Sequence, residues 1–430
     1  MREMKDSGIE WLGIIPENWK VLKVKNIAKR KSDKNRPDKQ VLSLYRELGI
    51  VIKSERDDNH NVTSENTDNY RYVEENDIVV NKMKAWQGSI AVSAYTGIVS
   101  PAYYVYKLTN QSVLPWFVHY MLRCKAYLPE YRRLSGGIRL GQWDLSDENF
   151  KNIPLPIPAT IEEQKQIVDY LDAKCSKIDE IIEKQQAIIE KLKEYKLSII
   201  TEAVTKGLNP DAEMKDSGNV EIGKIPSISR PTKLKYLCNT QGRIGFKGYT
   251  TTDLVDEGEG AYTLGASHLN NGKIDLTDPV FISWEKYYES PEIMVKQNDI
   301  LIVQRGSTIG KVAIVDKNYG EVTINPSLVL INKIHIDSKY LLYALSARYI
   351  ANYINLIGTT TAIPMISQKQ INDLVVIVPP DSIQNSVVKY LDEKCGKIDA
   401  NILKKQKLID KLLEYKKSLI YEVVTGKKEV

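Results

Sequence analysis

The amino-acid sequence predicts an α+β fold in which two similar α/β domains are separated by a pair of long antiparallel coiled-coil helices with pseudo-two-fold symmetry. Two observations predict it. The decapeptide YLDAKCSKID at residues 170–179 returns as YLDEKCGKID at residues 390–399, with only two letters changed. Each copy lies in a stretch with apolar residues at a sustained heptad spacing, which is typical of paired helices. Internal repetition on this scale decides the architecture.

The repeat divides the chain of 430 residues into four segments. The openings of the two domains support this division, because MKDSG at residues 4–8 returns at residues 214–218. The expected boundaries are residues 1–158 for the first domain, 159–206 for the first helical spacer, 207–379 for the second domain and 380–430 for the second helical spacer.

The middle of each domain is expected to mix strands and helices. Short β-branched runs, such as DIVV from Asp77 and DILIV from Asp299, are bounded by Gly and Asn, which favours strands and turns. The stretches that begin PWFVHY at Pro115 and SKYLLY at Ser338 have apolar residues at helical spacing. The middles agree in pattern but differ in letters, so one scaffold would present two different surfaces.

Both closing helices are expected to begin by the same device. Each follows an apolar run punctuated by proline, IPLPIP or VVIVPP. Thr160 with Glu163, and Asp381 with Gln384, have the residue types and spacing of a capping box.

The heptad series of the two helices are interrupted at matching places. Gln185 and Lys196 break the first series, and Lys405 and Lys416 break the second. Matched polar interruptions can fix the register of a coiled coil at some cost in stability. The alternative is that each helix is an ordinary amphipathic helix buried on its own domain. The apolar residues expected in the seam are Leu171, Ile178, Ile182, Ile189, Leu192, Ile199, Leu391, Ile398, Ile402, Ile409, Leu412 and Leu419.

Composition and charge exclude several classes of protein. The sequence begins with the charged stretch MREMKDSGIEWLG, and no apolar run approaches the roughly 20 residues of a membrane span, so we expect a cytoplasmic protein. The four cysteines form no CxxC pair and have no neighbouring pair of histidines, which argues against disulfides and zinc. The net charge of +5 permits nucleic-acid binding without requiring it.

No fragment of the sequence predicts a catalytic or metal site. GSTIGKV at residues 306–312 resembles a phosphate-binding loop, but its spacing is one residue short and Val312 replaces the Ser or Thr that binds magnesium. SPAY from Ser100 and NPSL from Asn325 lack the second proline of the methyltransferase tetrapeptide. We therefore expect that the chain itself is not an enzyme.

The repeated motifs together resemble the specificity subunit of a type I restriction-modification system over essentially the whole chain. The resemblance rests on the MKDSG openings, the NDI(V/L) to Gly-x-x-Ala stretches, and RGSTIGKVAIV at residues 305–315. It also rests on the helix starts PIPATIEEQKQIVDYLD and PPDSIQNSVVKYLDEK. The second start departs slightly from the first, with Asn385 where the first has Lys165.

The resemblance implies a DNA-binding protein of a phage-defence system whose chemistry is done by its partners. Each α/β domain would be a target-recognition domain that reads one half of a bipartite, asymmetric site in double-stranded DNA. The paired helices would set the distance between the halves. Two methyltransferase (modification) subunits would bind S-adenosylmethionine and methylate adenine, and two restriction subunits would use ATP and Mg for translocation and cleavage. No cofactor is expected in this chain, and no membrane is expected as a partner.

The residues expected to contact DNA are basic, polar and aromatic side chains on loops bounded by glycine. Lys and Arg bind backbone phosphates, and Arg, Lys, Asn and Gln form paired hydrogen bonds to base edges. For each residue a plain surface or core role is the alternative, and for Trp86 simple packing. In the first domain the candidates are Lys82, Lys84, Trp86 and Gln87 in NKMKAWQG, with Arg139 and Gln142 in SGGIRLGQW. In the second domain they are Gln304, Arg305, Ser307, Thr308 and Lys311, with Thr359 and Thr360 in GTTTA and Arg243 and Lys247 in GRIGFKG.

Two other classes of protein are compatible with the sequence. A coiled-coil scaffold without DNA specificity would join other proteins through its two globular ends. A stand-alone DNA-modifying enzyme would carry catalytic residues that the motifs do not reveal. Binding to random DNA that weakens steeply with salt separates the scaffold from a DNA-binding protein. Methyl transfer by the chain alone would establish the enzyme.

Overall fold

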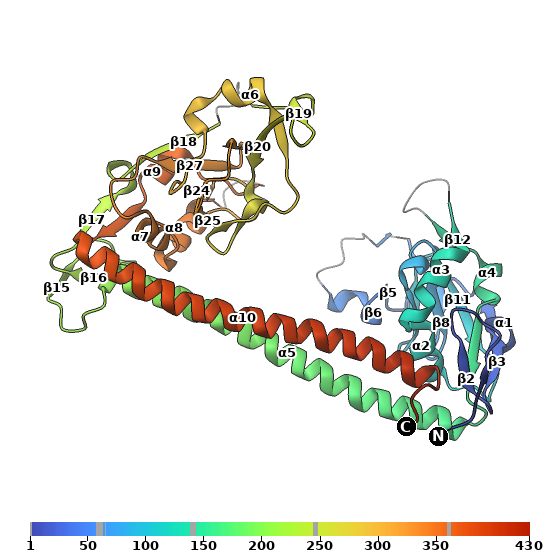
Figure 1. Ribbon diagram of the computed structural model, residues 1–430. Helices are drawn as coiled ribbons and strands as arrows, with labels where there is room; N and C mark the ends of the chain where they lie inside the picture. The colour runs from blue at the N-terminus through green and yellow to red at the C-terminus, as the bar shows by residue number, and fades with distance from the viewer. Residues whose placement is uncertain (1, 57–62, 65, 138–142, 244–247, 359–362) are drawn as a thin grey trace. The chain divides into compact units, whose positions relative to one another are not determined.

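The computed structural model describes the chain apart from residues 1, 57–62, 65, 138–142, 244–247 and 359–362 (Figure 1). The chain folds as two compact units, which we call unit 1 and unit 2. Unit 1 comprises Met1–Gln185 and Lys407–Val430, and unit 2 comprises Gln186–Gln406. Each unit therefore contains one α+β domain and a segment of each long helix. None of the described helices is both long and apolar enough to cross a membrane.

Unit 1 is built on an antiparallel four-stranded sheet with the order β4-β11-β8-β9. The central strand β8 is buried along its whole length, because Val79 and its neighbours on β9 and β11 pack against an apolar cluster that includes Leu42, Ile50 and Val73. The sheet strands are β4 (Ala28–Lys31), β11 (Tyr103–Leu108), β8 (Ile78–Asn81) and β9 (Ile90–Val92).

The other elements of unit 1 are antiparallel strand pairs and short helices. The pairs are β1 (Met4–Asp6) with β2 (Ile14–Pro16), β3 (Lys20–Lys23) with β14 (Pro154–Ile157), β5 (Leu42–Tyr45) with β6 (Gly49–Ile52), β7 (Arg71–Val73) with β10 (Gly97–Val99), and β12 (Ser135–Gly136) with β13 (Asp144–Leu145). The helices are α1 (Val24–Ile27), α2 (Pro115–Arg123), α3 (Leu128–Leu134) and α4 (Asp147–Lys151).

Unit 2 repeats this plan with an antiparallel sheet in the order β18-β27-β24-β25. A second four-stranded sheet, β19-β23-β20-β26, contains the parallel pair β20–β26. The first sheet comprises β18 (Asn239–Gly242), β27 (Leu328–Asn332), β24 (Ile300–Val303) and β25 (Val312–Ile314). The second comprises β19 (Leu254–Val255), β23 (Phe281–Ser283), β20 (Gly260–Leu264) and β26 (Val322–Ile324).

Antiparallel pairs and short helices complete unit 2 as well. The pairs are β15 (Met214–Asp216) with β16 (Lys224–Pro226), β17 (Arg230–Lys233) with β28 (Val375–Val378), and β21 (Leu269–Asn270) with β22 (Lys273–Ile274). The helices are α6 (Trp284–Tyr288), α7 (Ser338–Leu345), α8 (Arg348–Gly358) and α9 (Gln368–Asn372). The matching order of the two main sheets confirms the expected α+β fold built twice.

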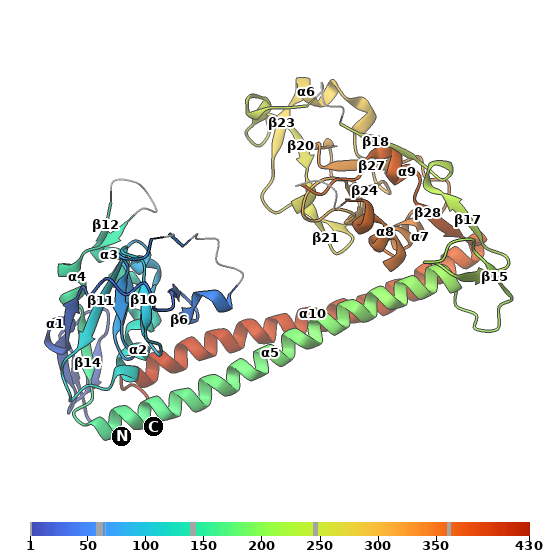
Figure 2. The ribbon, with the colours of Figure 1, turned by 180° about the vertical axis from the view of Figure 1, so that it is seen from behind.

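The long helices are α5 (Ile161–Lys206) and α10 (Asp381–Val424), and their segments lie side by side in each unit (Figures 1 and 2). In unit 1, Lys416 Nζ lies 2.6 Å from Asp179 Oδ2. In unit 2, Lys196 Nζ lies 2.7 Å from Asp399 Oδ2. Residue numbers rise along α5 while they fall along α10, so the expected antiparallel packing is confirmed. Each aspartate ends one copy of the duplicated decapeptide, so the two copies occupy equivalent places on the two helices.

The residues expected in the helix seam all lie away from solvent to some degree. Leu192, Ile402 and Leu412 are half-buried. The others are buried, namely Leu171, Ile178, Ile182, Ile189, Ile199, Leu391, Ile398, Ile409 and Leu419.

The two long helices begin differently, and the expected capping box of α10 is wrong. At α5, Thr160 Oγ1 accepts the Glu163 N–H at 3.2 Å, which is one half of the expected capping box, while the Glu163 carboxylate accepts from Trp19 Nε1 instead of returning to the Thr160 N–H. At α10 the Gln384 N–H donates instead to the carbonyl of Pro380 at 3.1 Å. Asp381 is already helical, so its side chain accepts from the Gln384 side chain at 3.2 Å rather than capping the backbone.

Candidate nucleic-acid interface

Two equivalent loops follow the central strands β8 and β24, and each ends at a glycine with positive φ. Gly88 has a φ of 91° and Gly310 a φ of 80°, a region that side chains other than glycine seldom adopt. Each also lies close to a helix, because a Cβ would stand 2.7 Å from Leu128 at Gly88 and 3.0 Å from Ile354 at Gly310. The repeated Gly-x-x-Ala pattern therefore fixes the shape of a loop whose preceding residues are free to differ.

In unit 1 the structure brings the two predicted DNA-contacting stretches together. Trp86 and Trp143 have ring centroids 5.4 Å apart. Lys82 Nζ lies 3.1 Å from Asp144 Oδ2, and the Leu145 N–H donates to the Lys82 carbonyl at 3.0 Å. The loop after β8 and the stretch Trp143–Leu145 therefore form one surface, although more than 50 residues separate them in the sequence.

The tryptophans support this surface, and basic side chains line it. Trp86 is half-buried and its Nε1–H donates to the Met83 carbonyl at 3.1 Å, so packing accounts for much of its role. Gln87 is half-buried and Lys84 is exposed. Arg132, which the sequence analysis did not select, is exposed on α3 with its guanidinium 5.7 Å from the Trp143 ring. Its place just before the glycine-bounded sequence SGGIRLGQW is the feature that could have pointed to it.

The corresponding loop of unit 2 is held by Gln304 and presents Arg305. The Gln304 side-chain amide donates to the Pro326 carbonyl at 3.0 Å. The backbone carbonyl of Gln304 accepts the Ile366 N–H at 2.9 Å. Arg305 is exposed, and its backbone forms an antiparallel bridge with Met365. Gln304 thus positions the loop, while Arg305 is available to a ligand.

The rest of this loop is polar and open to solvent. Ser307 and Thr308 are exposed. Lys311 is half-buried, and its Nζ donates to Asn270 Oδ1 at 3.2 Å. Gly358, the described residue of the GTTTA stretch, adjoins the loop, because a Cβ there would stand 3.0 Å from Ile309 and its carbonyl accepts the Met365 N–H at 3.4 Å.

Several predicted residues are placed elsewhere or are not described. Arg243 is only 6% exposed, and its guanidinium donates to the Ile324 carbonyl and to Thr323 Oγ1, each at 3.1 Å. Burial lowers the pKa of Arg243 from its ordinary value. Arg243 thus binds β26 inside its own domain. The predicted residues Arg139, Gln142, Lys247, Thr359 and Thr360 lie outside the described residues.

A further basic group in unit 1 was missed by the sequence analysis. The guanidinium groups of Arg30 and Arg71 lie 4.3 and 5.9 Å from the ring of Tyr104. Among the described residues, Nε and Nη1 of Arg71 are buried without a hydrogen-bond partner. Burial, and then repulsion from Arg30, lowers the pKa of Arg71. Arg30 Nη1 lies 3.5 Å from Asp147 Oδ2, so Arg71 is the member of the pair whose buried donors lack a partner, which is costly.

Metal-binding and redox groups contribute nothing to these surfaces in the part of the chain that is described. No group of three or more His, Cys, Asp and Glu side chains there is placed to hold a metal ion. All four cysteines are buried and unpaired.

The fold and the loops define a recognition protein with two related but differently lined binding surfaces. Comparison with known families agrees, because the sequence model described as "Type I restriction modification DNA specificity domain" matches residues 16–201 and 243–412. The chain belongs to this family of type I restriction-modification specificity subunits. The expected role in DNA recognition, rather than catalysis, follows from that membership, and it disfavours a scaffold without DNA specificity.

Individual relatives resemble either nearly all of the chain or a part of it. The specificity subunit of the type I restriction enzyme MjaVIII from Methanocaldococcus jannaschii is 25% identical over 432 residues, covering 96% of this chain and 93% of that protein. The EcoBI specificity subunit from Escherichia coli is 27% identical over 175 residues, covering 40% of this chain and 36% of its own length. A solved structure from work on complex assembly and conformational transition of the type I R-M system has a TM-score of 0.69 at 14% identity, covering 96% of this chain and 99% of that one, which supports the fold.

Proposed function

We propose that each α+β domain reads one half of a bipartite, asymmetric site in double-stranded DNA, and that the paired helices set the spacing between the halves. One observation carries this proposal. The loops after β8 and β24 have the same place and the same closing glycine, yet they present different side chains. Met83 in unit 1 stands where unit 2 has Arg305, and Trp86 stands where unit 2 has Thr308. Two recognition domains that share a fold but have different contact residues suit a DNA site whose two halves differ.

The chemistry of the exposed side chains divides them between affinity and specificity. Lys84 and Arg132 in unit 1 suit phosphate contacts, which supply affinity and position the protein on the duplex. Arg305 in unit 2 suits a paired hydrogen bond to guanine, because its guanidinium is exposed on a loop whose backbone is held at both ends.

The partners follow from the same proposal. Two methyltransferase subunits would bind the chain, one for each copy of the repeated scaffold, and two restriction subunits would complete the complex. S-adenosylmethionine, ATP and Mg would be held by these partners and not by this chain, and the complex would work in the cytoplasm, where its DNA lies.

A domain exchange tests the proposal. Residues 17–156 would be replaced by the corresponding segment of another specificity subunit, and the methylated motif would be read by sequencing the host genome for modified bases. We expect one half of the motif to change and the other half to persist. Loss or change of both halves would contradict independent readers.

A helix insertion tests the role of the spacer separately. One heptad inserted after Gln185 and another after Lys405 preserves the seam and lengthens the pair by roughly 10 Å, at about 1.5 Å per residue. The undefined bases between the half-sites should increase by about one to three, while the half-sites keep their sequence. Altered half-sites with an unchanged spacer would show that the helices do not set the distance.

A further inference from the structure

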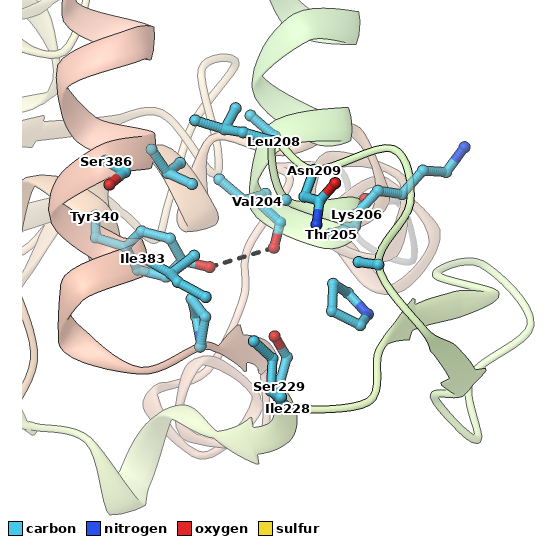
Figure 3. Close-up of a pocket in the computed structure, with 16 residues that line it drawn as sticks. Val204, Thr205, Lys206, Leu208, Asn209, Ile228, Ser229, Tyr340, Ile383 and Ser386 are labelled. Carbon is cyan, nitrogen blue, oxygen red and sulfur yellow. Dashed lines mark hydrogen bonds between the residues drawn. The ribbon is translucent and has the colours of Figure 1, made fainter.

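Unit 2 contains a cavity of about 200 Å³ where the end of α5, the turn between β16 and β17, and the start of α10 meet (Figure 3). We call it the ring pocket. Its walls are mostly apolar and come from segments that are far apart in the sequence. They include Val204, Leu208, Pro226, Ile228, Tyr340 and Ile383.

The same place in unit 1 is filled by a tryptophan. Trp19 and Ser229 are equivalent, because the N–H of each donates to the carbonyl of a proline three residues earlier, at 3.0 and 2.9 Å. The Trp19 side chain is fully buried. Its ring lies 6.0 Å from Phe117, and its Nε1–H donates to Glu163 Oε1 at 2.9 Å. The scaffold of this protein therefore accommodates an indole ring at this position.

The neighbours of Trp19 correspond to the walls of the ring pocket. Phe117 is the third residue of α2, and its counterpart Tyr340 is the third residue of α7. Glu163 is the third residue of α5, and its counterpart Ile383 is the third residue of α10. Both Tyr340 and Ile383 line the ring pocket, so unit 2 keeps the walls and lacks the ring.

Four side-chain hydroxyls line the ring pocket, and those of Thr205 and Ser386 donate to carbonyls of their own helices at 2.6 and 2.9 Å. The Tyr340 hydroxyl is already bonded to the carbonyls of Ile377 at 2.8 Å and Val204 at 3.2 Å. Ser229 is only 3% exposed, and its hydroxyl has no hydrogen bond to any described residue. Of these four described hydroxyls, that of Ser229 is therefore the one that remains available to a bound molecule.

We propose that the ring pocket binds a planar, bicyclic aromatic molecule of the size of indole, with an N–H or O–H group directed at the Ser229 hydroxyl. An apolar cavity of about 150 Å³ in another protein binds benzene, so this volume suits a somewhat larger ring. The pocket is reachable, because Leu208 and Ile228 in its wall are 42% and 60% exposed. A bound ring would join the end of α5 to the start of α10, as Trp19 joins α5 to its domain in unit 1. The proposal is independent of the reading of DNA.

Indole itself is the probe for the first test, with the full-length chain titrated by calorimetry. We expect saturable binding of one indole per chain. In Ser229→Trp the new indole side chain should fill the ring pocket. This variant should therefore bind indole at least tenfold more weakly, while its melting temperature rises by a few degrees. Ser229→Ala keeps the cavity but removes the hydroxyl, so it should bind indole several-fold more weakly and naphthalene unchanged. Absence of saturable binding to the natural chain, or unchanged indole binding by S229W, would overturn the proposal.

Trp19→Ser is the matched variant in unit 1, since it should open a second site and raise the number of indole molecules bound to two. If W19S does not fold, as circular dichroism would show, the S229W result decides alone.

A final experiment repeats the indole titration on the chain assembled with its methyltransferase subunits. Retained binding supports a free small molecule as the occupant. Loss of binding in the assembly would show that a partner's aromatic side chain fills the pocket, and would overturn the proposal in its stated form.

Discussion

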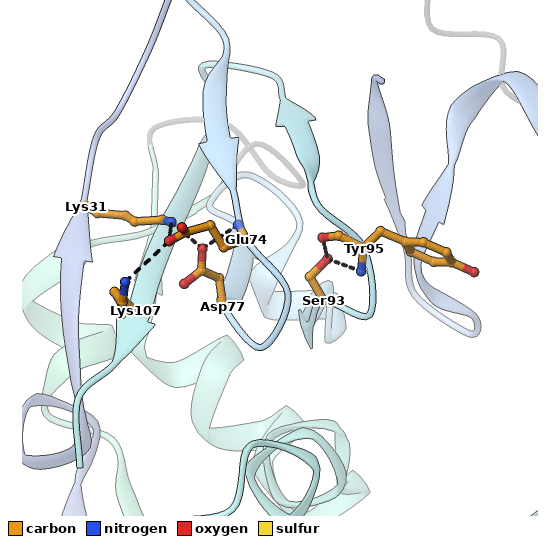
Figure 4. Close-up of polar contacts among 6 residues, drawn as sticks. All are labelled: Lys31, Glu74, Asp77, Ser93, Tyr95 and Lys107. Atoms are coloured by element: carbon orange, nitrogen blue, oxygen red, sulfur yellow. Dashed lines mark hydrogen bonds and ion pairs between the residues drawn. The ribbon is translucent and has the colours of Figure 1, made fainter. Parts of the chain in front are cut away.

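The strands β8 and β24 begin with the same motif, but the charges around it differ completely. In unit 1, Lys31 Nζ lies 2.5 Å from Asp77 Oδ2 and 2.8 Å from Glu74 Oε2, and Lys107 lies 3.4 Å from the same Glu74 oxygen (Figure 4). In unit 2, Asp299 stands at the position of Asp77. The residues equivalent to Lys31, Glu74 and Lys107 are Gln241, Lys296 and Asn332, because the strand pairings of the two sheets correspond.

The part of the motif that both units keep is the part that shapes the backbone. Asn76 and Asn298 have positive φ values of 70° and 71°, which asparagine tolerates better than most residues. Asp77 accepts the Glu74 N–H and Asp299 the Lys296 N–H, each at 2.7 Å. The comparison teaches that the repeat preserves the turn into the central strand but not the charged side chains around it, because unit 2 has neutral amides in place of the two lysines and a lysine in place of Glu74.

Lys31→Gln gives unit 1 the side chain that unit 2 has at this position, Gln241, and should have the largest effect. The Asp77 side chain is 3% exposed and that of Lys31 is 11% exposed, so the variant leaves a buried carboxylate without its cation. Breaking a buried pair in this way costs about 3–5 kcal/mol of stability. Chemical denaturation followed by circular dichroism would measure it. Lys29→Gln, on the exposed face of the same strand, is the control and should change stability little. Equal stability of K31Q and the natural chain would show that the pair contributes nothing.

Burial raises the pKa of Asp77 in unit 1 as well as that of Asp299 in unit 2, and Asp299, which has no lysine in place of Lys31, should give a separate part of the dependence of stability on pH. Burial raises the pKa of Asp299 from 3.8 to about 6, so the folded protein holds a proton that the unfolded chain has already lost between those values. Stability should therefore fall as the pH rises from about 4 to about 6, by at most about 3 kcal/mol.

Two variants assign this part of the pH dependence to its residue. Asp299→Asn should remove it, because the amide keeps an acceptor for the Lys296 N–H but has no proton to lose. Gln241→Lys should reduce it by supplying the cation that Asp77 has. Melting temperatures at pH 4.5 and 7.5 would measure both, and an unchanged difference in D299N would contradict the assignment.

Arg305→Met makes the loop of unit 2 resemble that of unit 1, where Met83 stands at this place. Loss of a paired contact to guanine should lower discrimination within the second half-site by about 1–3 kcal/mol. Competition binding with DNA altered in one half-site at a time would measure it. Lys84→Ala is the matched variant and should weaken all DNA sequences equally, with a shallower dependence on salt. A uniform loss for R305M as well would show that Arg305 does not read a base.

The sequence was sufficient for features that depend on spacing along the chain. The heptad positions of α5 and α10 determine their burial directly, and the decapeptide located equivalent points on the two helices. The sequence was insufficient where a side chain forms its hydrogen bonds or ring contacts with residues that are far away along the chain. Arg243 lies on a glycine-rich stretch that suggests an exposed loop, but its partners Thr323 and Ile324 lie about 80 residues away on β26. The pair of Arg30 and Arg71 on one tyrosine likewise depends on strand pairing that no local pattern shows.

The smallest effects should come from the feature that the two units share most closely. The pairs Lys196–Asp399 and Lys416–Asp179 are partly exposed, so Lys196→Ala and Lys416→Ala should each lower stability by less than about 1 kcal/mol. Their equivalence makes a sharper test possible. Lys196→Asp would oppose two like charges across the helices and should cost more than Lys196→Ala, whereas adding Asp399→Lys should restore most of the loss. The same exchange at Lys416 and Asp179 should give the same pattern, because the local geometry is repeated. If restoration occurred in one unit and failed in the other, the two lysines would not be equivalent, and the repeated polar interruptions would need separate explanations.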